Sequence, residues 1–146
     1  MANKQLINKL NKSVANLQVL YVKLHNYHWN VKGPQFFSIH QVTESYYDYI
    51  AQQYDVIAER ILQLEAKPLT TLTEYLENAT IKEETGKDFN PPYILEKLIA
   101  DFCQLKNDFK EISNLANKND DVTTAAIADE NIAWLEKAIW MLKASK

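Results

Sequence analysis

The sequence contains only one cysteine, two glycines and four prolines in 146 residues. A single cysteine, Cys103, excludes an internal disulfide and favours a reducing compartment, so we expect a cytoplasmic protein. The scarcity of glycine and proline is typical of long helices joined by few turns. No stretch approaches 18 consecutive apolar residues, and the N-terminal MANKQLINKL lacks the apolar core of a signal peptide. We therefore expect neither a membrane span nor a secretory leader.

Acidic residues are missing from the first 43 positions, although the net charge of the chain is −3. Five of the 16 basic residues and none of the 19 acidic ones lie in this segment, so the remainder carries −8. The five are Lys4, Lys9, Lys12, Lys23 and Lys32. Such a segment suits a face that binds nucleic acid or anionic lipid. We favour the alternative, an ordinary solvated helix face.

Four segments repeat apolar residues at spacings of three and four, the pattern of a helix that buries one stripe. They cover residues 7–31, 47–64, 95–112 and 125–142. Stripes of this kind must be buried against each other, and four of them make the core of a helical bundle. We expect one domain that spans residues 1–146.

Helix-ending and helix-starting signals lie between these segments. Gly33-Pro34 breaks the first helix from the second, and Ser38 with Gln41 has the spacing of a capping box. Asn90 can cap the third helix with Pro91 at its first position. A polar turn at 118–121 leads into the fourth helix. The first and third turns are short, which predicts two antiparallel helical hairpins.

The second connection is much longer and runs from Ala66 to Asn90. Within it, Thr71 and Glu74 form another capping box, which predicts a short helix. One long crossover between two hairpins is the connection found in ferritin-like folds. We therefore expect an all-α, ferritin-like four-helix bundle with a short extra helix between helices two and three.

Two histidines flank the first turn. His28 lies on the apolar stripe of the first helix, and His28 and His40 are each six residues from position 34. Equal distances from the turn of an antiparallel hairpin make the two side chains neighbours. A single such histidine is commonly a satisfied core residue, whereas two facing imidazoles favour a metal site.

Three carboxylates follow on the second helix. Glu44 is one turn from His40, and Asp55 and Glu59 are stacked four residues apart. Taken alone, the last two suit a solvated flank with Arg60 as their partner. His40 and Asp55 are roughly 22 Å apart along a helix, so they cannot share a metal ion within one chain. A shared site requires a second subunit, related by a two-fold axis that pairs the second helices in antiparallel fashion.

The segment His25 to Arg60, HNYHWNVKGPQFFSIHQVTESYYDYIAQQYDVIAER, resembles the core of the mini-ferritins, the Dps family ("DNA-binding protein from starved cells"). Leu135 to Ala144, LEKAIWMLKA, is similar to the last helix of that family. The resemblance covers essentially the whole chain. It implies a hollow homododecamer that oxidises Fe(II) with hydrogen peroxide, or more slowly with dioxygen, and stores the ferric mineral. The chain would then be a ferroxidase, an oxidoreductase that limits oxidative damage.

The resemblance also implies a ligand set for ferroxidase centres between two-fold related subunits. His28 and His40 match the histidine ligands, and Asp55 and Glu59 match the carboxylates of the partner. Glu44 stands where the family usually has an aspartate, and His25 is outside the ligand set. Histidine and carboxylate together suit Fe(II), and Zn(II) can bind the same groups.

Further residues take their expected roles from the same resemblance. Trp29 and Trp140 would lie near the centre and intercept radicals, or simply pack in the core or an interface. Acidic residues at the start of the last helix would line iron-entry pores. The candidates are Asp120, Asp121, Asp129 and Glu130, although Ala125 and Ala126 stand where a second pore aspartate is expected.

An alternative function within the same family is non-specific binding and compaction of DNA. DNA-binding members carry flexible lysine-rich tails. Here the apolar stripe begins by Ile7, which leaves Lys4 alone in the segment before it, and Lys143 and Lys146 lie at the C-terminal end. We therefore expect DNA binding to be weak or absent.

Overall fold

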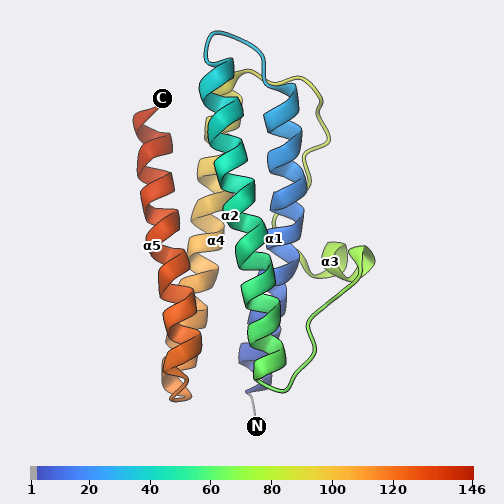
Figure 1. The fold of residues 1–146 in the computed structure, drawn as a ribbon, viewed down its shortest axis with the longest axis vertical. Coiled ribbons are helices and arrows are strands. Elements are labelled where there is room, and N and C mark those ends of the chain that lie inside the picture. The colour runs from blue at the N-terminus through green and yellow to red at the C-terminus, as the bar shows by residue number, and fades with distance from the viewer. Residues whose placement is uncertain (1–2) are drawn as a thin grey trace.

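The computed structural model describes residues 3–146. It contains five helices: α1 (Lys4–Asn30), α2 (Phe36–Gln63), α3 (Leu72–Asn78), α4 (Pro91–Lys118) and α5 (Val122–Ala144). Helices α1 and α2 form one antiparallel hairpin and α4 and α5 form the other, and α1 also contacts α3 and α4 (Figure 1). The four long helices and the short one in the second connection were all predicted. No helix among the described residues is long and apolar enough to cross a membrane.

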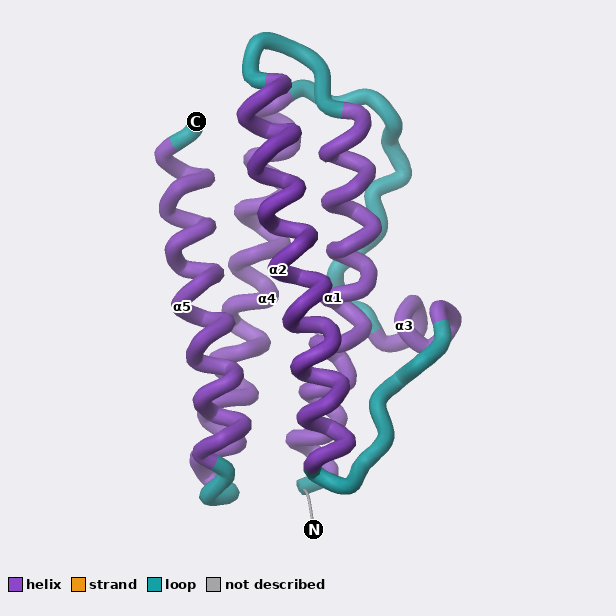
Figure 2. Tube along the Cα trace, in the orientation of Figure 1, coloured by secondary structure: helices purple, strands orange, loops and turns teal. Residues whose placement is uncertain are grey.

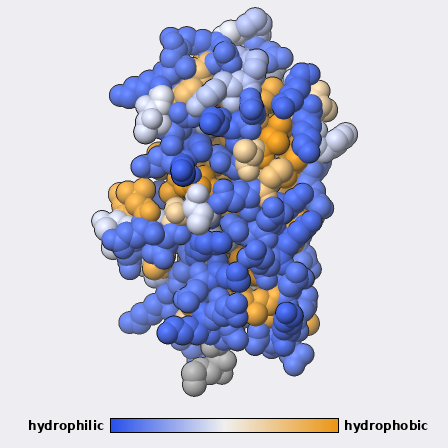
Figure 3. All heavy atoms as spheres, turned by 180° about the vertical axis from the view of Figure 1, so that it is seen from behind, coloured by the Kyte–Doolittle hydropathy of each residue, from blue (hydrophilic) through white to orange (hydrophobic). Residues whose placement is uncertain are grey.

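The core lies along the axis of the bundle. Its largest fully buried side chains come from three of the long helices and include Tyr27 on α1, Ile57 on α2 and Phe102 on α4. Helix α5 also contributes buried residues to this core, among them Leu135 and Leu142. Seen from behind, the surface is mostly hydrophilic, with hydrophobic side chains in small scattered groups (Figure 3). The bundle is therefore held by the stripes that the sequence predicts.

Most of the predicted helix caps are confirmed. Thr71 and Glu74 form the complete capping box of α3. The side chain of Asn90 accepts a hydrogen bond from the backbone N–H of Tyr93, and Pro91 begins α4. Each cap satisfies backbone groups that a helix end leaves unpaired.

The predicted capping box at Ser38 and Gln41 is wrong. Helix α2 begins earlier, at Phe36, and its N-cap residue Gln35 makes no side-chain capping bond. The reason is the tight turn at Gly33, whose φ of 123° is accessible to glycine, and whose carbonyl accepts a bond from the N–H of Phe36. Ser38 is consequently already inside the first turn of the helix.

Polar residues of α1 hold the long crossover, drawn as a loop beside α1 in Figure 2. The buried Asn16 side chain accepts hydrogen bonds from the backbone N–H groups of Thr80 and Ile81, at 2.8 and 2.9 Å. Lys23 donates to the carbonyl of Lys82 at 2.8 Å. These contacts satisfy backbone groups that a loop would otherwise leave unpaired, so they fix its path.

The lysines of α1 are largely paired with acids of α4, which corrects the expectation of a solvated basic face. Three ion pairs cross between the two helices: Lys9–Glu111 at 2.8 Å, Lys12–Asp108 at 3.2 Å and Lys23–Asp101 at 2.7 Å. Lys23 is only 6% exposed. The acids that neutralise the first helix lie 78 to 102 residues away in the chain, so the sequence pattern alone does not reveal them.

Candidate metal centre

His28, near the end of α1, and His40, near the start of α2, lie side by side. Their rings are stacked with centroids 3.7 Å apart and an angle of 14° between planes. His28 is buried and His40 is half-buried. The adjacency expected from their equal distances to the turn is therefore present in the structure.

Each of these histidines is held by the backbone of the other. Nδ1 of His28 is 2.6 Å from the carbonyl oxygen of His40, and Nδ1 of His40 is 2.8 Å from that of His28. A carbonyl oxygen only accepts, so both Nδ1 atoms carry the proton as donors. In the neutral form of each ring the lone pair is then on Nε2, the atom through which such an imidazole binds a metal ion.

Thr43 supports this arrangement, and sequence reasoning missed it. Its hydroxyl is 3.2 Å from Nδ1 of His28 and donates to the carbonyl of Ile39 at 2.6 Å. The residue is fully buried. The sequence did offer a signal, because Thr43 is a polar residue one turn beyond His40 on the buried side of α2. A search for apolar periodicity does not detect such a residue.

One carboxylate lies near the histidine pair. An oxygen of Glu44 is 4.0 Å from Nε2 of His28, and the Glu44 side chain is exposed. Among residues 3–146, no group of three or more histidine, cysteine, aspartate and glutamate side chains is placed to hold a metal ion. The half-site formed by His28, His40 and Glu44 therefore offers two nitrogen ligands and one neighbouring carboxylate.

Asp55 and Glu59 lie apart from this half-site, further along α2, and both are exposed. The alternative partner expected for them, Arg60, is bound elsewhere. Its guanidinium donates to Thr124 Oγ1 at 2.9 Å and to Asp121 at 2.9 Å, both at the start of α5. The proposed Arg60 pairing is therefore wrong, and the two carboxylates face solvent along α2.

The third histidine, His25, has a different setting. Its ring stacks on Tyr47 at 3.7 Å, and its Nδ1 is 2.8 Å from the carbonyl of Tyr21. Tyr47 also meets His28 edge-on at 5.3 Å, and burial raises its pKa, with a further contribution from the charge of Glu44. Tyr47 thus separates His25 from the His28–His40 pair.

The two tryptophans expected near the centre differ in position. Trp29 lies at the end of α1 with its ring 5.3 Å from that of His25, and it is 68% exposed. Trp140 is also exposed and lies on α5, a helix that carries none of the candidate ligands. Only Trp29 belongs to the aromatic group beside the half-site.

The candidate pore acids also differ from one another in their hydrogen bonds and exposure. Asp121 caps α5 and pairs with Arg60. Burial acts to raise the pKa of the Asp121 carboxyl, but hydrogen bonds from Thr124 and the Arg60 guanidinium outweigh burial and lower this pKa. Asp129 accepts a hydrogen bond from Ser113 at 2.6 Å. Asp120 and Glu130 are exposed. Asp121 therefore has a structural role within the chain, and Asp120 and Glu130 are the better candidates for attracting cations.

Comparison with known proteins finds ferritin-like relatives of the chain. A family model described as a ferritin-like domain matches residues 7–145. The DNA protection during starvation protein of Helicobacter pylori is 45% identical over 130 residues, which are 89% of this chain and 90% of that protein.

Solved structures give the same result. A Dps protein from Bacillus brevis has a TM-score of 0.93 at 41% identity, and the match covers 99% of this chain and 98% of that one. A Vibrio cholerae structure described as a DPS protein, from a superfamily of ferritin-like diiron-carboxylate proteins, has a TM-score of 0.92 at 36% identity. That match covers 97% of this chain and 88% of the other. The prediction of a ferritin-like fold is confirmed.

Proposed function

This chain belongs to the Dps family of ferritin-like proteins, and from that premise we propose that it is a ferroxidase and iron store. It oxidises Fe(II) at centres shared by two subunits and keeps the ferric product inside a hollow homododecamer in the cytoplasm. Its role is to limit the oxidative damage that free Fe(II) and peroxide cause together. Fe(II) is the substrate, and the mineral is the cargo.

The observation that carries this proposal is the reciprocal pairing of His28 and His40. Their Nδ1 atoms are both hydrogen-bonded to backbone carbonyls, which leaves the two Nε2 atoms for a metal ion, and Nε2 of His28 lies 4.0 Å from the carboxylate of Glu44. Packing alone does not require two stacked imidazoles with this orientation. A borderline metal ion such as Fe(II) suits imidazole and carboxylate together, and Zn(II) would compete for the same groups.

The carboxylates that complete the site come from a second subunit. Asp55 is roughly 22 Å along α2 from His40, too far for a common metal ion. A two-fold axis that pairs α2 with its copy in antiparallel fashion brings Asp55 and Glu59 of one subunit to the half-site of the other. Each dimer then has two equivalent centres.

The proposed reaction balances with two ferrous ions. Each Fe(II) gives one electron to hydrogen peroxide, whose O–O bond breaks, and two protons convert the products to two water molecules. Glu59 and Asp55 of one subunit and His28 of the other hold the first ion, and His40 and Glu44 steady the second. The carboxylates favour the more highly charged ferric product, which promotes oxidation.

Complementation tests the shared site. One variant carries His28→Ala and His40→Ala, and the other carries Asp55→Ala and Glu59→Ala. Each alone loses rapid Fe(II) oxidation, because every centre lacks half of its ligands. After the two are unfolded and refolded together, about half of the dimers are mixed and each mixed dimer has one intact centre, so about a quarter of wild-type centres return.

The control for this experiment is His25→Ala, which removes the histidine outside the half-site and should keep the activity. Shells shown by mass spectrometry to be mixed, yet no more active than the separate variants, would refute the shared centre. Light scattering tests the assembly, which should have about twelve times the 16.9 kDa mass of the chain. A stable monomer that oxidises iron rapidly would refute the dodecamer.

DNA binding is the alternative function, suggested by the name of the Helicobacter pylori relative. Three of the five N-terminal lysines are paired with acids of α4 and offer little free positive charge to phosphate. We therefore propose iron oxidation as the main role and DNA binding as weak or absent.

A further inference from the structure

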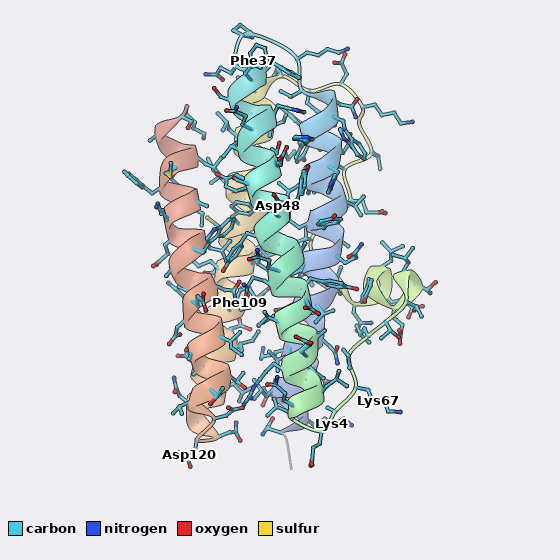
Figure 4. The ribbon with its side chains drawn as sticks, viewed as in Figure 1. Lys4, Phe37, Asp48, Lys67, Phe109 and Asp120 are labelled. Carbon is cyan, nitrogen blue, oxygen red and sulfur yellow. The ribbon has the colours of Figure 1, made fainter. Side chains whose placement is uncertain are left out.

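A cavity of about 620 Å³ opens between the first half of α2 and the C-terminal half of α5, and the start of α4 also lines it. Phe37, labelled in Figure 4, marks the end of α2 that borders this cavity. A volume of this size is typical of small-molecule sites. The walls are mainly apolar and include Ile39, Val42, Leu95, Trp134, Ala138 and Leu142. No candidate metal ligand lines the cavity, so it is distinct from the half-site.

Tyr46 lines the cavity, and its hydroxyl has no hydrogen-bond partner among residues 3–146. The residue is only 6% exposed, and burial alone raises its pKa to about 12. Other phenols of the interior are paired: Tyr27 donates to Glu84 at 2.8 Å, and Tyr49 donates to Asn131 at 3.2 Å. A buried hydroxyl without a partner costs free energy. The cavity therefore offers a hydrogen-bond donor to a molecule that enters it.

Lys137 is the one charged residue among the described residues that line the cavity. Its side chain is exposed, and within the described part of the chain it belongs to no ion pair. Because no carboxylate lines the cavity, the cavity does not suit a hard metal cation. A single ammonium group matches one negative charge rather than a polyanion. The charge of the lining therefore favours a monoanion.

The two polar groups lie on the same side of the cavity. The ring of Tyr46 meets that of Trp134 edge-on, with centroids 5.5 Å apart. Lys137 is three residues after Trp134 on α5, so the two side chains are neighbours on the helix surface. One head group can consequently reach both the ammonium group and the hydroxyl.

We propose that this cavity binds a monocarboxylate with an apolar tail, of the kind of a medium-chain fatty acid. The carboxylate pairs with Lys137 and accepts a hydrogen bond from the hydroxyl of Tyr46, while the tail lies against the apolar walls. This binding site is separate from the iron chemistry proposed above and does not depend on it.

Titration calorimetry with sodium decanoate, below its micelle concentration, tests the site in the assembled protein. We expect saturable binding of one decanoate per chain. The Lys137→Gln variant should bind decanoate about tenfold or more weakly, because a hydrogen bond between charged groups is lost. The Tyr46→Phe variant keeps the ring and loses only the hydroxyl, so its affinity should fall by about two- to tenfold.

Two controls separate recognition of the carboxylate from adsorption to apolar surface. Lys143→Gln changes an exposed lysine of the same helix that does not line the cavity, and it should leave decanoate binding unchanged. Decanol has the same tail without the charge. It should bind the wild type and Lys137→Gln with equal affinity.

Each outcome decides the inference. Absence of saturable binding to the wild type, or equal decanoate affinity in the wild type and Lys137→Gln, would overturn it. A change in the mass of the assembly in either cavity variant, measured by light scattering, would assign the cavity to a contact between copies and also overturn it. If Tyr46→Phe does not fold, the exposed Lys137 decides alone. The rate of Fe(II) oxidation plays no part, so this site and the proposed function fail independently.

Discussion

Charged side chains are paired in one region of the molecule and unpaired in another. The first region is the contact between α1 and α4, and the second is the outer face of α2. Across the first, three lysines meet three carboxylates at 2.7 to 3.2 Å. On the second, Glu44, Asp55 and Glu59 are exposed, and the nearby Arg60 is bound to α5. Paired charges therefore hold the chain together, whereas unpaired ones face outward, where a metal ion and a second subunit can neutralise them. The following predictions test this division.

The largest expected effect is the loss of Lys23. The Lys23→Met variant leaves Asp101 half-buried without its partner, and burial already raises the pKa of that carboxyl. Breaking a buried pair from one side costs about 3–5 kcal/mol of stability. Thermal unfolding should show it. Lys9→Met is the control: its pair with Glu111 is largely exposed and contributes less than about 1 kcal/mol. Equal losses in the two variants would contradict the distinction.

On the outer face of α2, the Glu59→Gln variant should lower the rate of Fe(II) oxidation by about 10- to 100-fold. Its stability should not fall, because the carboxylate is exposed and its removal reduces repulsion among the acids of α2. Stopped-flow kinetics and thermal unfolding measure the two quantities. Glu111→Gln is the matched control on the paired face and should keep its oxidation rate. A Glu59→Gln variant with normal kinetics would remove Glu59 from the centre.

The Asp121→Asn variant, which removes a paired carboxylate, should have a smaller effect and lose about 1 kcal/mol of folding stability. Its folded pKa lies below the unfolded value, so it stabilises the fold above about pH 4 and loses that contribution as pH falls through the folded pKa. The difference in unfolding temperature between wild type and Asp121→Asn should therefore shrink from pH 7 to pH 3. A difference that grows at low pH would mean that the pKa is raised.

The smallest expected effect is on DNA. We predict no mobility shift of duplex DNA at neutral pH and about 150 mM salt, where weak phosphate contacts are screened. The paired lysines of α1 and the net charge of −3 are the reasons. A shift that persists at this salt concentration, and disappears when the exposed Lys4 and Lys32 are changed to Gln, would show that lysines outside the α1–α4 ion pairs bind phosphate.

Several features of this protein could be predicted from its sequence because they depend on near neighbours in the chain. Helix stripes repeat every three or four residues, and the caps at Thr71 and Asn90 act within three residues. The adjacency of His28 and His40 required only a short turn and two antiparallel helices. That the centre needs a second subunit followed from the rise of a helix and stays a prediction.

Other features were decided by the tertiary structure, because they depend on residues distant in sequence. The acids of α4 pair with the lysines of α1, and the start of α5 binds Arg60. The turn at Gly33, which starts α2 before the expected cap, follows a hydrogen bond from the N–H of Lys32 to the distant carbonyl of Phe89. The reciprocal bonds that fix the tautomers of His28 and His40 need two helices in register. Periodicity reports which face of a helix is buried, but only packing determines which partner covers it.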